Sequence, residues 1–168
     1  MNDLKPARLS EKFLDTAKRR LAHIVDGTEA DLRRATSDLY YALFHRICEC
    51  LVAPMGIPDQ PEREEFRELF RLMYRLPDHS YTSKKCREIQ GHDFSEEIKT
   101  VAQLFVTMRS KREFSDYDPL QRFAFSSVNN DLGAVDHALT ALDQVSLVEL
   151  ARFAFFVSLR NGRKVDVK

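Results

Sequence analysis

The apolar residues of this chain recur with the period of an α-helix from near its beginning to near its end. They return every three or four positions in successive stretches, whereas the strict alternation typical of a strand is nearly absent. Only 5 glycines and 6 prolines punctuate the 168 residues. The pattern predicts an all-α protein, an up-and-down antiparallel bundle of five to six helices with short connections.

Capping and helix-breaking residues locate the expected helices. The first runs from a cap at Ser10 to Gly27, and the second, long enough for the centre of the bundle, runs from Thr28 to just before Pro54. The others are expected from Pro61 to Leu76, from Asp93 or Ser95 to before Ser115, from Ser126 or Ser127 to Leu142, and from Ser146 to about Arg160. Residues 78–92 are polar and are expected to form a loop with one short helical turn at most.

Size and composition fit one soluble domain over residues 1–168, with a core of about 10–160. Hydrophobic residues make up 43% of the chain and charged residues 31%. Lys plus Arg equals Asp plus Glu at 26 each, so nucleic-acid binding would depend on a local basic patch. The last expected helix is apolar over more than one face, so we expect it to be buried on two sides or to cover a subunit interface.

Targeting signals are not evident, and we expect a cytoplasmic protein without contact to membranes. The segment 1–8 is polar with no apolar core, and the apolar run 153–159 is far too short to span a bilayer. The three cysteines, an odd number, suit a reducing compartment.

Sequence signatures of metal and cofactor sites are also missing. The five glycines are scattered, so no phosphate-binding loop is indicated. The spacings of His79, Cys86 and His92 are not those of a structural zinc site, and Cys48 and Cys50 point to different faces of one helix. We therefore expect no metal and no cofactor.

Two segments remain that could carry chemistry. Residues 37–45 place two tyrosines, a phenylalanine and a histidine within the second helix, and residues 109–118 form a basic helix end that continues into Asp-Tyr-Asp. Together they resemble the HEPN family, over residues 10–145. This resemblance implies a small helical bundle that binds nucleotides or RNA, is typically dimeric, and often pairs with a nucleotidyltransferase or an antitoxin. Some members are ribonucleases that act as toxins.

The resemblance also suggests which residues bind and which react. Active HEPN ribonucleases carry an arginine followed after four to six residues by a histidine, but here Arg112 is followed by Tyr117 at that spacing. An ordinary tyrosine has a pKa near ~10 and is a poor base at neutral pH. The resemblance therefore implies weak or absent ribonuclease activity, with Arg112 and Tyr117 as the first catalytic candidates and Arg87 and His92 as the second. The candidate nucleotide- or RNA-binding residues are Tyr41, His45, Arg109, Lys111, Arg112 and Asp116.

Each of these residues also has a purely structural interpretation. Aromatic residues in the second helix can belong to the core, and His45 can be a buried hydrogen-bonded group instead of a titrating one. Cations at a helix C-terminus are favourable in any protein, and Asp116 and Asp118 could simply pair with the arginines. The functional interpretation requires the guanidinium groups of Arg109 and Arg112 to stand free beside Tyr117 in an open groove. Otherwise a pure protein-interaction module is indicated.

Overall fold

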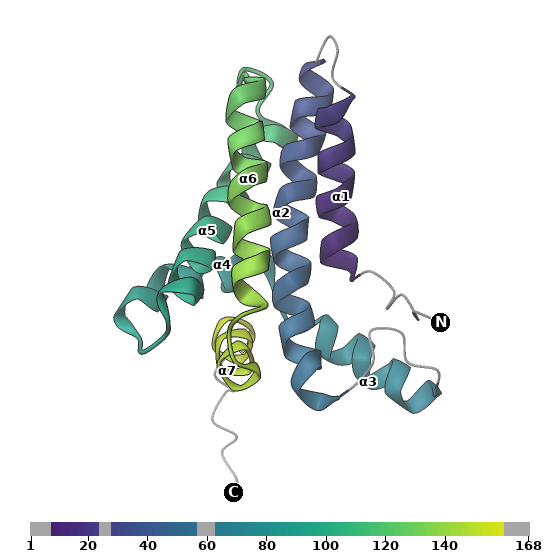
Figure 1. Cartoon of the computed structure of the whole chain (residues 1–168), viewed down its shortest axis with the longest axis vertical. Coiled ribbons are helices and arrows are strands. Elements are labelled where there is room, and N and C mark those ends of the chain that lie inside the picture. The colour runs from purple at the N-terminus through teal and green to yellow at the C-terminus, as the bar shows by residue number, and fades with distance from the viewer. Residues whose placement is uncertain (1–7, 24–27, 57–62, 160–168) are drawn as a thin grey trace, which may run out of the picture.

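The computed structural model describes residues 8–23, 28–56 and 63–159. All regular secondary structure in these ranges is helical, and they contain no strand (Figure 1). The elements are α1 (Leu9–Ala22), α2 (Glu29–Val52), η1 (Ala53–Met55), α3 (Glu64–Tyr74), α4 (His79–Glu88), η2 (Ile89–Gly91), α5 (Glu96–Tyr117), α6 (Phe125–Leu142) and α7 (Leu147–Ser158). The all-α prediction is confirmed. The expected number of helices, five to six, is too low, because seven α-helices form within the described ranges.

Helix α2 is the central element, as its length and apolar content predict. It packs against α1, α5, α6, α7 and α3, and Leu39, Leu43, Ile47 and Leu51 along it are almost completely buried. In Figure 1, α1, α2 and α6 run side by side along the long axis, α5 leans away from them, and α7 lies across one end of the molecule. One cluster of buried apolar side chains draws on α1, α2, α4, α5, α6 and α7.

The start of α1 differs from the predicted cap at Ser10. The cap is Arg8, two residues earlier, and the Glu11 carboxylate accepts a hydrogen bond from the backbone N–H of Arg8 at 2.8 Å. Ser10 is instead buried inside the helix, where its backbone N–H and hydroxyl donate to Glu49 on α2 at 2.9 and 2.6 Å. The prediction failed because a serine at a helix start can cap the helix or join it to a neighbour, and the sequence does not distinguish the two.

Two other predicted caps are confirmed. Thr28 Oγ1 accepts from the backbone N–H of Asp31 at 3.3 Å, and Ser146 Oγ accepts from that of Glu149 at 3.2 Å. Ser95 is the residue before α5, one of the two predicted starts, although its side chain makes no capping hydrogen bond. The predicted boundaries at Gly27, Pro61 and Arg160 lie outside the described residues.

The prediction that residues 78–92 form a loop is wrong, because this segment forms α4 and η2. Asp78 caps α4 by accepting from the backbone N–H groups of Ser80 and Tyr81, at 3.1 and 2.8 Å. The inward face of α4 consists of the small or weakly polar residues Thr82, Ser83 and Cys86. A face of this kind carries little hydrophobic periodicity, so a search for apolar repeats overlooks the helix.

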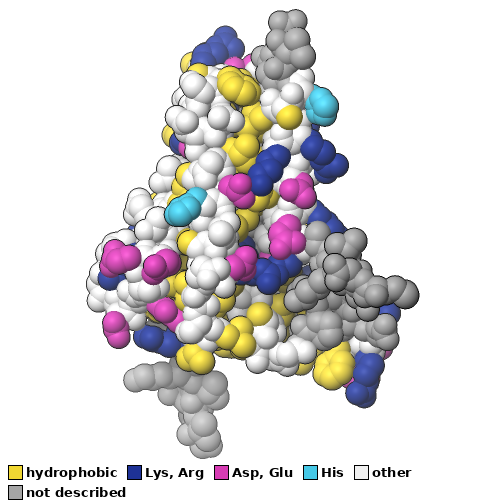
Figure 2. Space-filling model, in the orientation of Figure 1, with side chains coloured by type: hydrophobic (Ala, Val, Ile, Leu, Met, Phe, Trp, Pro, Cys, Tyr) yellow, Lys and Arg dark blue, Asp and Glu magenta, His cyan; other side chains and the backbone are white. Residues whose placement is uncertain are grey.

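No helix within the described residues is long and apolar enough to cross a membrane. The three cysteines are free thiols buried in the core, Cys48 and Cys50 on α2 and Cys86 on α4. On the face shown in Figure 2, the charged groups of both signs are interspersed, without a broad basic patch.

Candidate functional site

The two segments singled out in the sequence meet where α2 packs against the C-terminal half of α5. The Arg112 Nη2 atom lies 3.3 Å from the Tyr41 hydroxyl and donates to it. The guanidinium carbon of Arg112 stands 5.8 Å from the centre of the Tyr41 ring and 5.5 Å from that of Tyr117. Arg112 therefore lies within cation–π distance of two aromatic rings, a favourable position for a guanidinium group.

The arginines are not free, contrary to the requirement of the functional interpretation. Arg112 Nε lies 2.7 Å from Asp116 Oδ2, and Arg109 Nη2 lies 2.8 Å from Glu113 Oε1. Lys111 contacts both carboxylate oxygens of Asp131 on α6, at 2.6 and 2.7 Å. Each of the three cations thus has a carboxylate partner, and the cluster carries little net charge.

Asp116 has a second, structural role in this cluster. Its Oδ1 accepts from the hydroxyl of Ser37 on α2 at 2.8 Å, and that hydroxyl also lies 3.1 Å from Ser115 Oγ. Asp116 therefore ties α5 to α2 while it fixes Arg112. The alternative in which aspartates pair with the arginines is confirmed for Asp116 but is wrong for Asp118, whose side chain accepts from the backbone N–H of Leu120 at 2.8 Å.

The electrostatic surroundings of Arg112 keep it protonated. Burial opposes its charge, but the neighbouring Tyr41 and Asp116 outweigh that effect, so the pKa of Arg112 is raised. The Arg112 side chain is about a quarter exposed.

His45 lies in a stack of aromatic rings beside this cluster. Its ring is parallel to that of Phe13, with centroids 5.0 Å apart, and stacks on Tyr74 at 5.7 Å. His45 Nδ1 lies 3.0 Å from the Tyr74 hydroxyl. Burial, together with the nearby His79, lowers the pKa of His45 to about 4, so its imidazole is neutral at physiological pH. Of the two interpretations left open, the hydrogen-bonded structural group fits this geometry.

His79 also belongs to the site, which its position in the sequence does not predict. It is the first residue of α4, and its ring stacks on Phe44 with centroids 3.9 Å apart. Its Nδ1 lies 2.6 Å from the hydroxyl of Tyr40. The next residue, Ser80, accepts a hydrogen bond from Arg109 at 3.3 Å. The Asp78 cap was a sequence signal that could have revealed this helix end.

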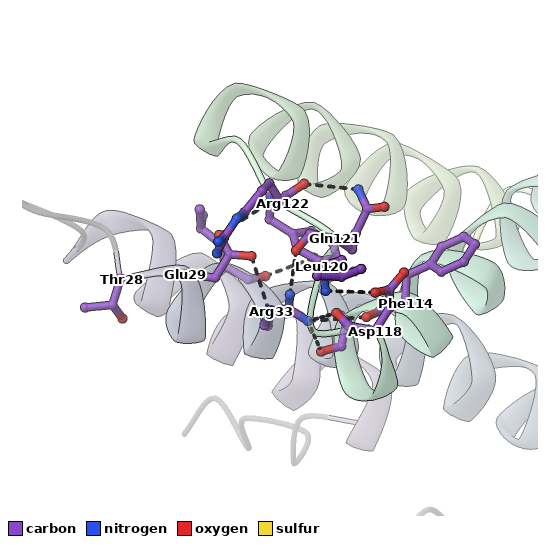
Figure 3. A network of polar contacts seen from close by, with 12 residues as sticks. Thr28, Glu29, Arg33, Phe114, Asp118, Leu120, Gln121 and Arg122 are labelled. Carbon is purple, nitrogen blue, oxygen red and sulfur yellow. Dashed lines mark hydrogen bonds and ion pairs between the residues drawn. The ribbon is translucent and has the colours of Figure 1, made fainter.

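Arg33 on α2 fixes the end of α5 and the connection that follows it (Figure 3). Its guanidinium group donates to four backbone carbonyl groups, those of Phe114, Ser115, Asp118 and Gln121, at 3.3, 2.9, 3.0 and 2.5 Å. It also pairs with Glu29 at 3.2 Å and lies 5.2 Å from the centre of the Phe123 ring. This role is not visible in the sequence, because the five N–H donors of the arginine guanidinium group can bind backbone carbonyl groups of any sequence.

The second catalytic pair, Arg87 and His92, is not part of this site. His92 lies on a groove of about 860 Å³ beside α7, with its ring 4.5 Å from that of Phe156, and Arg87 is exposed on the last turn of α4. No group of three potential metal ligands occurs within the described part of the chain.

Comparison with known proteins does not assign this chain to a family: no family model, curated protein or solved structure matches it.

Proposed function

We propose that this protein binds nucleotides or single-stranded RNA on the surface formed by α2, the start of α4 and the end of α5. The observation that carries the proposal is the position of Arg112 close to the rings of both Tyr41 and Tyr117. Guanidinium groups bind phosphate oxygens through paired donors, and exposed aromatic rings stack on bases of any sequence. Tyr117 is 72% exposed and is available for such stacking. The resemblance to HEPN proteins supports the same ligand class.

Asp116 competes with an incoming phosphate for the guanidinium group of Arg112. A phosphate that approaches Arg112 meets a guanidinium already paired at 2.7 Å, so it must displace or share that carboxylate. The nearly neutral cluster also attracts a polyanion less strongly than a basic groove would. Modest affinity is therefore expected, and removal of the competing charge should increase it.

Fluorescence anisotropy with a labelled single-stranded RNA of about 12 nucleotides tests this proposal. Arg112→Gln should weaken binding about tenfold, which corresponds to about 1.4 kcal/mol. Asp116→Asn keeps an acceptor for Ser37 and should strengthen binding. Arg87→Gln, an exposed arginine outside the site, is the matched control and should leave affinity unchanged. Equal affinity for the wild type and Arg112→Gln would disprove the site.

We propose that ribonuclease activity is weak or absent. The residue after Arg112 at the spacing of the HEPN motif is the exposed phenol of Tyr117, and His45 and His79 are both hydrogen-bonded to tyrosines. Purified protein incubated with the same RNA in the presence of a chelator should leave it intact. Cleavage that disappears in Arg112→Gln or Tyr117→Phe would establish the toxin-type, metal-independent ribonuclease instead. Cleavage that disappears only in His92→Gln would assign it to the Arg87 and His92 pair.

A second candidate function, protein interaction, is favoured by the apolar groove beside α7. One side of α7 lies in the core, but Leu147 and Val148 on the other side are 51% and 73% exposed. The groove is lined by Pro54, His92, Asp93, Phe94, Leu147, Val148, Ala151, Arg152, Phe155 and Phe156. Because Asp93 and Arg152 place both signs of charge on this apolar surface, it suits a two-fold contact with a second copy of the chain. We therefore propose a homodimer through α7; a nucleotidyltransferase or antitoxin is the alternative partner that the resemblance implies.

Light scattering coupled to size-exclusion chromatography gives the molar mass and so tests the proposed homodimer. The wild type should elute as a dimer, and Val148→Glu should elute as a monomer because it buries a charge in the contact. Leu120→Glu, at an apolar residue that is 85% exposed elsewhere, should remain dimeric. A monomeric wild type at high concentration would rule out the homodimer and direct attention to a different partner.

A further inference from the structure

The imidazole of His79, on α4, is held by groups of α2 at the edge of the proposed site. Tyr40 and Phe44 hold it, through the 2.6 Å contact to Nδ1 and the 3.9 Å ring stacking. The ring of Tyr41, also on α2, stands edge-on at 6.2 Å, and the Tyr41 hydroxyl accepts a hydrogen bond from Arg112 of α5. His79 therefore faces the same aromatic and guanidinium groups that form the proposed ligand surface.

The Tyr40 hydroxyl determines where the proton of His79 resides. Tyr40 is 1% exposed, and within the described residues its hydroxyl makes one hydrogen bond, to His79 Nδ1. A buried hydroxyl that does not donate loses about 1–3 kcal/mol, so Tyr40 donates and Nδ1 accepts. Burial also raises the pKa of Tyr40, which keeps the phenol protonated. The neutral imidazole must then carry its proton on Nε2, and no described residue accepts a hydrogen bond from this N–H group.

The surroundings of His79 favour a neutral donor over a second cation. Burial and the charges of Arg112 and Arg109 lower the pKa of His79, with a smaller opposing effect of Asp78. A neutral N–H group can approach these arginines without repulsion and still donate a hydrogen bond to an anion. A phosphate bound by Arg112 has further oxygen atoms that can accept a hydrogen bond from such a donor.

We propose that His79, fixed by Tyr40 as the Nε2–H tautomer, donates a hydrogen bond to the phosphate that Arg112 binds. This inference rests on the proposed function, and it adds a ligand-binding residue from α4 to those from α2 and α5. His79 then contributes to recognition of the phosphate without adding charge. Its position explains why a histidine stands at the first turn of α4 when Asp78 already caps that helix.

The tautomer can be measured on the unmodified protein. Nitrogen-15 NMR of the imidazole distinguishes a protonated Nε2 from a protonated Nδ1, without any ligand. The expected result for His79 at neutral pH is a protonated Nε2 and an unprotonated Nδ1, and in Tyr40→Phe a mixture of the two tautomers. A protonated Nδ1 in the wild type would overturn the proposal.

Binding of the labelled RNA tests the contact itself. His79→Phe keeps a ring to stack on Phe44 but has no donor, and its affinity should fall about five- to tenfold. His79→Gln can place an amide N–H near the position of Nε2 and should stay within about twofold of the wild type. His137→Phe, an exposed histidine on α6, is the control. If Arg112→Gln abolishes binding and His79→Phe does not, the inference fails and the proposed function stands; if neither variant changes binding, both fail.

Discussion

His45 shows how the same aromatic surroundings that stabilise a side chain also fix its charge. Its ring is stacked on Phe13 and Tyr74 and is neutral, with a pKa of about 4 against an ordinary value of 6.5. In the unfolded chain the same imidazole takes up a proton near its ordinary pKa. Between these two values the unfolded state binds a proton that the folded state does not, so the contribution of His45 to stability is complete above about pH 6.5 and is lost as the pH falls towards 4.

Replacement of His45 by asparagine isolates this effect. Asparagine retains a polar group near the position of Nδ1 for Tyr74 but cannot be protonated, so the wild type should exceed His45→Asn in stability by more at about pH 7.5 than at about pH 4.5. Thermal unfolding of both proteins measures that difference. The comparison cancels the opposite pH dependence of Glu49 and Asp38, whose pKa values burial raises. A difference that is independent of pH would contradict the neutral buried state of His45.

Among the elements, the connection between α5 and α6 depends on one side chain of α2. Arg33 donates to four carbonyl groups at or just beyond the end of α5, where carbonyl groups commonly lack partners within the helix. That of Phe114 also accepts from the backbone N–H of Asp118 at 3.0 Å. The planar guanidinium group reaches several acceptors at once, which an ammonium group cannot do in the same geometry. The position of Tyr117 at the end of α5 thus depends on Arg33.

Arg33→Gln should destabilise the protein by about 2 kcal/mol, because several charge-assisted hydrogen bonds at a half-buried site are lost. Urea unfolding gives the free energy of unfolding. Arg34→Gln, the exposed neighbour on the same turn, should change it by less than about 0.5 kcal/mol. Equal effects of the two substitutions would show that the connection does not need Arg33.

The helices differ in how much of them the sequence could predict. The α2 helix has apolar residues on nearly every face and a threonine cap, so periodicity and capping both reveal it. The α4 helix buries Thr82, Ser83 and Cys86, whose small side chains pack closely but do not form an apolar repeat. At the site, the resemblance placed Arg112 and Tyr41 in one set of candidate binding residues, and Arg112 donates a hydrogen bond to the Tyr41 hydroxyl. The pairing of Arg112 with Asp116, four residues later on the same helix, could also be anticipated from the sequence. The approach of His79 depends on how α4 packs on α2, which local sequence does not determine.

At the scale of the whole molecule, the three cysteines report on whether the bundle opens as one unit. Cys48 and Cys50 lie on the central helix and Cys86 on the peripheral α4, and each is 1% exposed. Burial raises the pKa of all three thiols, to about 11 for Cys50 and about 12 for Cys86. In the folded state they are therefore both inaccessible and uncharged, and a thiol reagent can react only after opening.

Because Cys86 belongs to the same buried cluster as Cys48 and Cys50, α4 should not open before α2. Labelling with a thiol reagent at increasing urea concentration, followed by mass spectrometry, should yield molecules with no label or with three and almost none with one. Ser126→Cys, at an exposed residue of α6, should react at once and shows that the reagent is active. A population labelled at Cys86 alone would mean that α4 opens separately. Such opening would also remove His79 and Ser80 from their places beside the arginines.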